Sequence, residues 1–167
     1  IINGSPTIAT NGSTQNLCLG SAAVLSGNMT SVGTGEWSVV SGPSSTTSQF
    51  SSISNPTATF TPDGGAGSYV VRWTISNSPC SNSTADATIT VKTPVAITSA
   101  TAASSPICSG STTTLTANGV VGDSAVVTWY TGSGATGTNL GTGLTLTANP
   151  GTYYAYIRYE DDSLNPT

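Results

Sequence analysis

Apolar and polar residues alternate along short segments of this chain, and turn-forming residues separate the segments. In residues 68–76, Tyr69 and every second residue after it up to Ile75 is apolar, while Arg72 and Thr74 lie between them. Successive side chains of a strand point to opposite faces, so this period of two predicts a half-buried strand with Tyr69 on its core face. The same pattern, bounded by Gly, Pro and Asn turn signals, predicts strands at residues 7–10, 22–26, 36–40, 57–61, 68–76 and 85–91.

A related pattern occurs twice along the chain. Residues 18–28 and 108–118 share Cys, Gly, Ser, Leu and Asn at a constant offset of 90. Two further landmarks recur at a smaller offset: Trp37 with Trp129, and Gly67-Ser68-Tyr69 with Gly151-Thr152-Tyr153. Because the offset changes between the matches, the length differences fall in loops. The repeat therefore indicates two divergent copies of one module.

The module boundary is predicted near Lys92, where a strand-like run ends and Pro94 follows. We accordingly expect one domain in residues 1–93 and a second in residues 94–167. The second module stops early, because no seventh strand is visible after Tyr159. A β-sandwich without its last strand exposes an unpaired edge, so we expect the polypeptide to continue or a partner chain to cover the gap.

Composition supports strands and turns and excludes several classes of partner. Ser and Thr make up 56 of the 167 residues, which disfavours long helices, while 36% apolar residues can still close a core. With three Lys or Arg and a net charge of −4, the chain has no basic stripe for nucleic acid or an anionic membrane surface. No apolar run approaches the ~20 residues that span a bilayer, so direct membrane insertion is not expected.

Many short strands indicate a sandwich or a barrel, and two motifs favour the sandwich. Trp37 on the third predicted strand and Tyr69 at the start of the long strand resemble the buried Trp and the tyrosine corner of immunoglobulin-like domains. The Cys that usually follows the tyrosine by two residues is replaced by Val71. We therefore predict an all-β chain of two tandem immunoglobulin-like (PKD-like) sandwiches, the second truncated and neither with the usual inter-sheet disulfide.

Three segments carry a more specific resemblance: residues 35–42 around Trp37, residues 55–61 and residues 67–75, followed by Cys80. They are similar to the PKD-like and immunoglobulin-like repeats of Bacteroidetes surface proteins, most of all the giant gliding-motility adhesins of the SprB type exported by type IX secretion. The resemblance implies a non-enzymatic, structural or adhesive segment of an extracellular cell-surface protein. Its implied partners are neighbouring repeats of the same polypeptide, surface polysaccharide or other surface proteins. The alternative is an accessory or carbohydrate-binding module of a secreted glycoside hydrolase.

Three cysteines in a chain expected to be secreted imply one disulfide and one further thiol. The natural pair is Cys18 with Cys80, whose loop closure is worth roughly 4 kcal/mol. In simple immunoglobulin topology, however, these two residues lie at opposite ends of the sandwich, whereas a disulfide needs Cα atoms within ~7 Å. Either the strand order near residue 18 differs or these cysteines pair with neighbouring repeats. Cys108 has no counterpart after Tyr153.

Residues for catalysis are sparse. The absence of His excludes His-based triads and most zinc or copper sites, so we expect neither an enzyme nor a resident cofactor. Oxygen ligands gather only at Glu160, Asp161 and Asp162, which could hold calcium at a domain junction. A solvated acidic turn that protects a sheet edge is the favoured interpretation of this cluster.

Two modification sites and one binding face complete the candidates. Ser124 and Ser163 lie in Asp-Ser-apolar tripeptides that match an O-glycosylation sequence of Bacteroidetes, although so short a match also arises by chance. Tyr154 and Tyr156 share the strand face opposite the core and could stack on sugar rings or on a partner surface. Burial under a missing strand or an adjacent domain is the favoured alternative for this pair.

Overall fold

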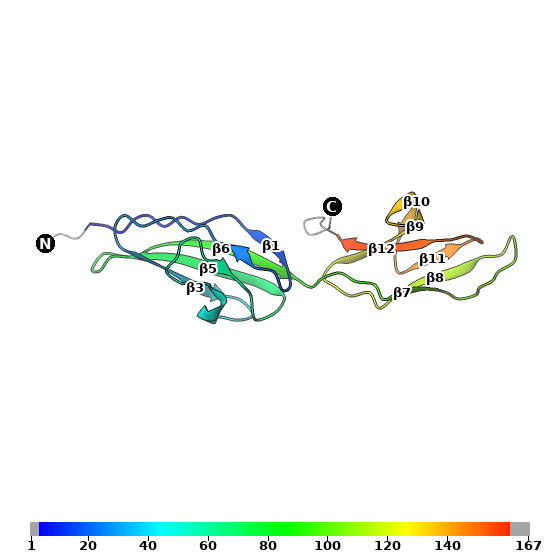
Figure 1. Cartoon of the computed structure of the whole chain (residues 1–167), viewed down its shortest axis with the longest axis horizontal. Helices are drawn as coiled ribbons and strands as arrows, with labels where there is room; N and C mark the ends of the chain where they lie inside the picture. The colour runs from blue at the N-terminus through cyan, green and yellow to red at the C-terminus, as the bar shows by residue number, and fades with distance from the viewer. Residues whose placement is uncertain (1–3, 161–167) are drawn as a thin grey trace. The chain divides into compact units, whose positions relative to one another are not determined.

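The structure is a computed structural model that describes residues 4–160, and it divides into two compact units, Ile1–Lys92 and Thr93–Thr167 (Figure 1). Strands build both units, and one short 3₁₀ turn, η1 (Thr47–Gln49), lies in unit 1. Within the described residues, no helix has the length and apolar character needed to cross a bilayer. The predicted all-β class is confirmed.

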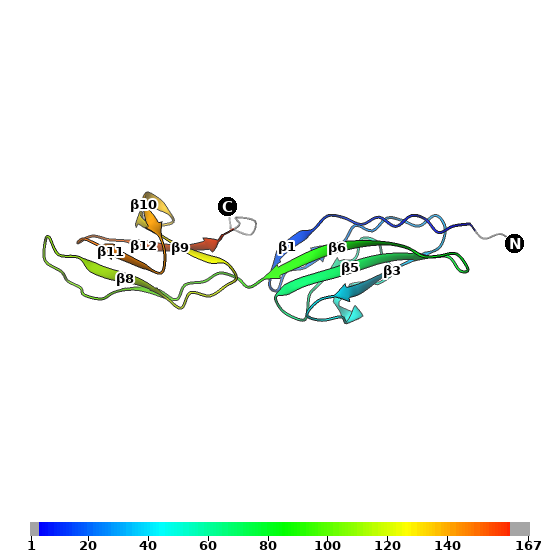
Figure 2. The same ribbon diagram turned by 180° about the vertical axis from the view of Figure 1, so that it is seen from behind.

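Unit 1 is built from one large sheet and one small one. The large sheet has the order β1-β6-β5-β3, and Figure 2 shows its long strands side by side. Its strands are β1 (Gln15–Cys18), β6 (Ser83–Lys92), β5 (Gly67–Ser76) and β3 (Thr34–Ser41). The small sheet pairs β2 (Ala23–Val24) with β4 (Thr59–Phe60). The neighbouring pairs of the large sheet are antiparallel except β1 and β6, which run parallel.

The core of unit 1 lies between these sheets and is rich in aromatic rings. The alternation predicted for β5 is confirmed, because Tyr69, Val71, Trp73 and Ile75 are all buried. Trp37 on β3 faces Trp73, with ring centroids 4.9 Å apart. Such tilted aromatic pairs stabilise a core beyond the area they bury. The aromatic core therefore fixes the packing of β3 against β5.

Unit 2 contains two three-stranded sheets. One has the order β10-β9-β12 and the other β11-β8-β7. Their strands are β7 (Ser99–Ala102), β8 (Thr113–Asn118), β9 (Ala125–Gly132), β10 (Thr136–Thr142), β11 (Thr145–Ala148) and β12 (Tyr154–Tyr159). The cluster of buried residues here consists of Ala117, Val127 and Trp129 and is much smaller than the core of unit 1.

The N-terminal region of unit 1 differs from the prediction. Residues 7–10 do not form a regular strand, although the Thr7 N–H donates to the Val32 carbonyl and the Asn28 side chain holds Thr10. The strand lies later, at β1, and pairs with the last strand of the unit. Gln15–Cys18 shows no clear apolar alternation, so its strand conformation depends on the edge that β6 offers.

No disulfide joins Cys18 to Cys80 in the structure, in line with the topological objection to this pair. Pairing with neighbouring repeats stays a prediction. Cys18 pairs with Lys92 at the end of β6, whereas Cys80 lies in the connection that precedes the start of β6. The ten residues of β6 separate the two positions by roughly 30 Å at the usual strand rise. This distance is several times the reach of a disulfide.

Candidate functional site

The candidate binding face lies on the outer side of sheet β10-β9-β12 in unit 2. Tyr154 and Tyr156 occupy alternate positions of β12, so both side chains point to the same side of the sheet. Tyr154 is 39% exposed and Tyr156 is half-buried. The structure thus brings the two predicted tyrosines together on a surface that is open at one end.

Sequence reasoning missed a third tyrosine of this face. Tyr130 lies directly across from Tyr154 in the β9–β12 pair, and Thr128 lies across from Tyr156. Side chains at such opposed positions are within contact range, so Tyr130 extends the aromatic surface to the central strand. The signal was available, because Trp129 must point inward and therefore turns its neighbour Tyr130 outward. We call Tyr130, Tyr154 and Tyr156 the aromatic face.

Hydrogen bonds on the core side hold this sheet in place. The indole Nε1 of Trp129 donates to the Gly143 carbonyl at 3.0 Å, just as Trp37 in unit 1 donates to Asn55 at 2.9 Å. The Tyr159 hydroxyl donates to the Thr93 carbonyl at 3.1 Å. Buried polar atoms of large aromatic residues need such partners, so these bonds fix both ring orientation and strand position.

Each unit also contains a tyrosine corner. The hydroxyl of Tyr69 donates to the Gly65 carbonyl and accepts from the Gly64 N–H, both at 3.1 Å. In unit 2 the hydroxyl of Tyr153 donates to the Asn149 carbonyl at 3.0 Å, again four residues back. The expectation that Trp37 and Tyr69 are buried in the core is confirmed.

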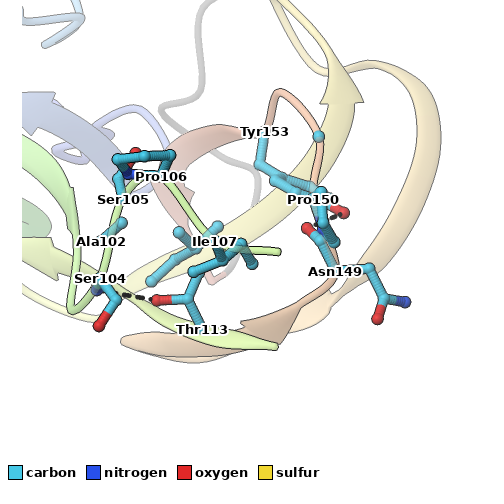
Figure 3. Close-up of a pocket in the computed structure, with 11 residues that line it drawn as sticks. Ala102, Ser104, Ser105, Pro106, Ile107, Thr113, Asn149, Pro150 and Tyr153 are labelled. Carbon is cyan, nitrogen blue, oxygen red and sulfur yellow. Dashed lines mark hydrogen bonds between the residues drawn. The ribbon is translucent and has the colours of Figure 1, made fainter. Parts of the chain in front are cut away.

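Two open pockets, each of about 250 Å³, lie beside the start of β12. Figure 3 shows Ser105 and Pro106 on one side of the first pocket and Pro150 and Tyr153 on the other. Leu115 and Tyr153 line both pockets, and Trp129 contributes to the second. The walls are therefore mixed, with Ser, Thr and Asn beside the apolar side chains, and no charged side chain is among the described lining residues.

The acidic residues do not converge into a site within the described part of the chain. No group of three or more metal-ligating side chains is present between residues 4 and 160. The Glu160 N–H donates to the Ser124 carbonyl at 2.9 Å, while Asp161 and Asp162 lie outside the described residues. The calcium site at Glu160, Asp161 and Asp162 stays a prediction.

Two carboxylates in unit 1 have perturbed proton affinities. The Arg72 guanidinium donates to both carboxylate oxygens of Asp86, at 2.6 and 2.8 Å, and lowers the pKa of Asp86 below its ordinary value. Hydrogen bonds from Ser44 and then Thr46 lower the pKa of Asp63. Both carboxylates are exposed and their partners explain the shifts, so these groups stabilise local structure on the surface.

One predicted glycosylation site can be examined. Ser124 is exposed and has a positive φ of 55°, in the connection that leads into β9. The preceding Asp123 accepts hydrogen bonds from the backbone and the hydroxyl of Thr93, at 3.0 and 2.6 Å. Ser124 is thus exposed on a turn that the hydrogen bonds between Asp123 and Thr93 hold in place. Ser163 lies outside the described residues.

No protein-family model matches this chain, and no curated protein matches it by sequence. Solved structures do match. Extracellular domains 3–5 of Drosophila OTK are 14% identical with a TM-score of 0.57, over 92% of this chain and 58% of that one. An amphioxus IgVJ-C2 molecule is 11% identical with a TM-score of 0.47, over 86% of this chain and 99% of that one. The match to the OTK domains, together with the strand pairing above, shows that this chain has the immunoglobulin-like β-sandwich fold.

Proposed function

We propose that this chain is a structural, load-bearing segment of an extracellular adhesive protein, in which sandwich modules in series hold a binding surface away from its anchor. The observation that carries the proposal is the parallel pair β1 and β6 in unit 1. A pulling force enters the unit before β1 and leaves after β6. Because the two strands are parallel, this force acts along them in opposite directions and loads their hydrogen bonds together.

The β1–β6 ladder has a defined register that suits this role. Four residue pairs run from Gln15 opposite Ile89 to Cys18 opposite Lys92. The Leu19 N–H adds a bond of 2.8 Å to the Lys92 carbonyl. Bonds loaded in shear must break together, whereas bonds pulled open from one end break in turn. Unit 1 should therefore resist force better than a unit that has no such pair.

Single-molecule force spectroscopy of the whole chain tests this proposal. We expect two classes of unfolding event, with the stronger class assigned to unit 1. Leu19→Pro removes the Leu19 N–H donor and should weaken that class, because proline cannot donate a backbone hydrogen bond. Leu19→Ala keeps the donor and serves as the matched control, since Leu19 is 41% exposed. Equal forces for Leu19→Pro and Leu19→Ala would contradict the load-bearing role.

The finer assignment is to a giant gliding-motility adhesin of the Bacteroidetes surface, non-enzymatic and displayed at the cell surface. It is supported by the resemblance of residues 35–42, 55–61 and 67–75 to those repeats and by the nearly uncharged Ser/Thr surface, which tolerates glycans and changes in salt. Antibodies against unit 1 should label intact cells, and disruption of the gene should impair spreading on a surface. Labelling only after lysis would overturn the surface location.

The alternative, a carbohydrate-binding module of a secreted glycoside hydrolase, is favoured by the aromatic face. Tyrosine rings on an open sheet face can stack on sugar rings. In this case Tyr154→Ala with Tyr156→Ala should abolish glycan-array binding by the whole chain. Leu144→Ala, which removes another exposed apolar side chain from unit 2, should leave binding intact. If the wild-type chain binds no glycan, the alternative is rejected.

A further inference from the structure

Asparagine stands directly before glycine at three places in this chain, Asn3, Asn11 and Asn118. This dipeptide is chemically labile, because the glycine nitrogen, with no side chain beside it, can attack the side-chain carboxamide of the asparagine. Whether it does so depends on how the fold holds the two groups. Asn3 lies outside the described residues, so the structure allows a comparison of Asn11-Gly12 in unit 1 with Asn118-Gly119 in unit 2.

The two reacting groups of Asn11-Gly12 lie against each other. The Gly12 N–H donates to Oδ1 of Asn11 at 2.8 Å. The carbon that the nitrogen would attack, Cγ, is bonded directly to that oxygen, so a rotation of the carboxamide brings it to the nitrogen. Both residues lie outside the strands, in the connection before β1, so no strand pairing prevents this rotation. Holding reacting groups together in this way removes much of the entropic cost of a reaction.

The leaving group of Asn11 is also unrestrained. Its Nδ2 is buried and has no hydrogen-bond partner among the described residues. A buried donor without a partner is rare in folded proteins and unfavourable. Loss of this nitrogen as ammonia therefore breaks no hydrogen bond within the described part of unit 1. Asn11 and Gly12 are only half-buried, so water reaches the site.

Asn118-Gly119 has the same dipeptide but a restrained side chain. Asn118 is the last residue of β8, and its carbonyl accepts from the Thr98 N–H at 2.9 Å. Its Nδ2 donates to Oγ1 of Thr101 at 3.0 Å and to the carbonyl of Thr116 at 3.2 Å. Attack on this carboxamide would first require these two side-chain bonds to break.

We propose that Asn11-Gly12 is a site of spontaneous modification, at which the fold of unit 1 promotes conversion of Asn11 to isoaspartate and aspartate. The Gly12 nitrogen loses its proton and forms a bond to Cγ, the Cγ–Nδ2 bond breaks, and Nδ2 leaves with a proton as ammonia. Water then opens the cyclic imide. Attack of water on Cγ leaves aspartate, whereas attack on the backbone carbonyl carbon leaves isoaspartate, with the chain running through the side chain.

The modification falls between two points at which unit 1 holds the chain. Just before it, the Thr10 N–H donates to Oδ1 of Asn28 at 2.8 Å, and just after it the chain enters β1 at Gln15. Isoaspartate lengthens the backbone between these points by a methylene carbon, and either product adds a carboxylate to a chain of net charge −4. Unit 1 should therefore weaken irreversibly as the protein ages. This inference concerns a reaction of the free chain and does not depend on the load-bearing proposal.

Peptide mapping by mass spectrometry tests the proposal on the whole, folded chain at mildly alkaline pH. We expect Asn11 to deamidate about tenfold or more faster than Asn118, which is the effect of one or two net hydrogen bonds on a rate. In urea the two rates should agree within about twofold, because the unfolded chain holds neither carboxamide in place. Equal rates in the folded chain, faster loss at Asn118, or a rate at Asn11 that is lower in the folded chain than in urea would overturn the proposal.

The products and a matched variant test the mechanism. Opening of the imide should give isoaspartate as well as aspartate at position 11, and the modified chain, separated by ion exchange, should show a lower melting midpoint for unit 1 only. Thr101→Val removes one acceptor of the Asn118 side chain and should accelerate deamidation of Asn118 several-fold while leaving Asn11 unchanged. Aspartate alone at position 11 would overturn the cyclic route. An unchanged rate at Asn118 in Thr101→Val would reject hydrogen bonding as the cause of the difference between the two sites.

Discussion

Units 1 and 2 solve the same packing problem with different residues. Each has a buried tryptophan, on β3 in unit 1 and on β9 in unit 2, whose indole N–H donates to a backbone carbonyl. In unit 1 that tryptophan, Trp37, lies opposite Trp73, whereas in unit 2 Trp129 lies opposite Ala155. Two residues before the tryptophan, the order of sizes reverses, because unit 1 has Gly35 and unit 2 has a bulky valine. The valine thus offsets part of the volume that the smaller residue opposite Trp129 leaves.

The two units differ more in how their sheets end. Strand β6 covers β5 in unit 1 and completes a core that includes Ile89 and Val91. The corresponding edge of β12 in unit 2 has no covering strand among the described residues, and pockets open beside Tyr153. Stability of a small sandwich depends on the apolar area it buries. We therefore expect unit 1 to be the more stable module, and the following substitutions test where that difference arises.

The largest expected effect comes from the buried tryptophans Trp37 and Trp129. Trp37→Ala should destabilise unit 1 by about 3–5 kcal/mol, because it leaves a cavity and removes contacts with Trp73 and Phe50, whose ring centroids lie 4.9 and 6.3 Å away. Trp129→Ala should cost less, since its neighbours are aliphatic and the pocket beside it is already open. Denaturant titration followed by residue-resolved NMR separates the two units. A larger loss from Trp129→Ala would contradict the expected order of the two effects.

A size exchange in unit 1 should have the next largest effect. A side chain at Gly35 would collide with the Trp73 ring, so Gly35→Val alone should destabilise unit 1 by about 1–3 kcal/mol. Combined with Trp73→Ala, it recreates the arrangement of Val127 and Ala155 in unit 2. We expect the double variant to lose less stability than the two single losses added together, as a double-mutant cycle measures. If the losses of the two single variants simply add, the residues at positions 35 and 73 do not compensate for each other in size.

Sequence reasoning could anticipate features that a single strand encodes. The alternation in β5 fixed its buried face, and the Trp and Tyr motifs indicated the sandwich. It could not locate β1, because Gln15–Cys18 shows no clear apolar alternation and forms a strand only against β6. Strands β2 and β4 are two residues long, shorter than predicted. The prediction failed for a related reason, because their length is set by pairing with each other and not by periodicity.

In the candidate site, too, features of a single strand could be predicted, whereas features that depend on strand pairing could not. Tyr154 and Tyr156 could be placed on one face from the period of two alone, but the addition of Tyr130 required the register of β9 against β12. The pocket beside Tyr153 could not be foreseen, since it is formed by segments almost fifty residues apart. The disulfide prediction relied on cysteine number, whereas the length of β6 decided against it.

The tyrosine corners should show a smaller difference between the units. Tyr69→Phe removes a hydroxyl that both donates and accepts a hydrogen bond in a part-buried setting, so we expect a loss of about 1 kcal/mol or slightly more. Tyr153→Phe removes one hydrogen bond at an exposed site and should cost less. Urea midpoints for the two variants compare them directly. If Tyr153→Phe proves the more costly, its corner would be more important to unit 2 than its exposure indicates.

The smallest expected effect is on the stability of unit 1 at acid pH. Arg72 donates to Asp86 and holds the pKa of that carboxyl below the ordinary value of 3.8 in the folded state. A group whose pKa is lower in the folded state stabilises the fold above its ordinary pKa. That contribution is lost as the pH falls from about 3.8 through the lower, folded value.

Because both side chains are more than a third exposed, at 37% and 41%, solvent screens the pair and the contribution stays small. Asp86→Asn should therefore lower the melting midpoint of unit 1 slightly at pH 7 and not at a pH well below 3.8, where the wild-type carboxyl is also uncharged. Arg72→Gln should change the midpoint in the same direction, since it removes the other partner of the same ion pair. A difference between Asp86→Asn and wild type that persists undiminished in acid would show that packing, and not the charge of Asp86, supports β5 against β6.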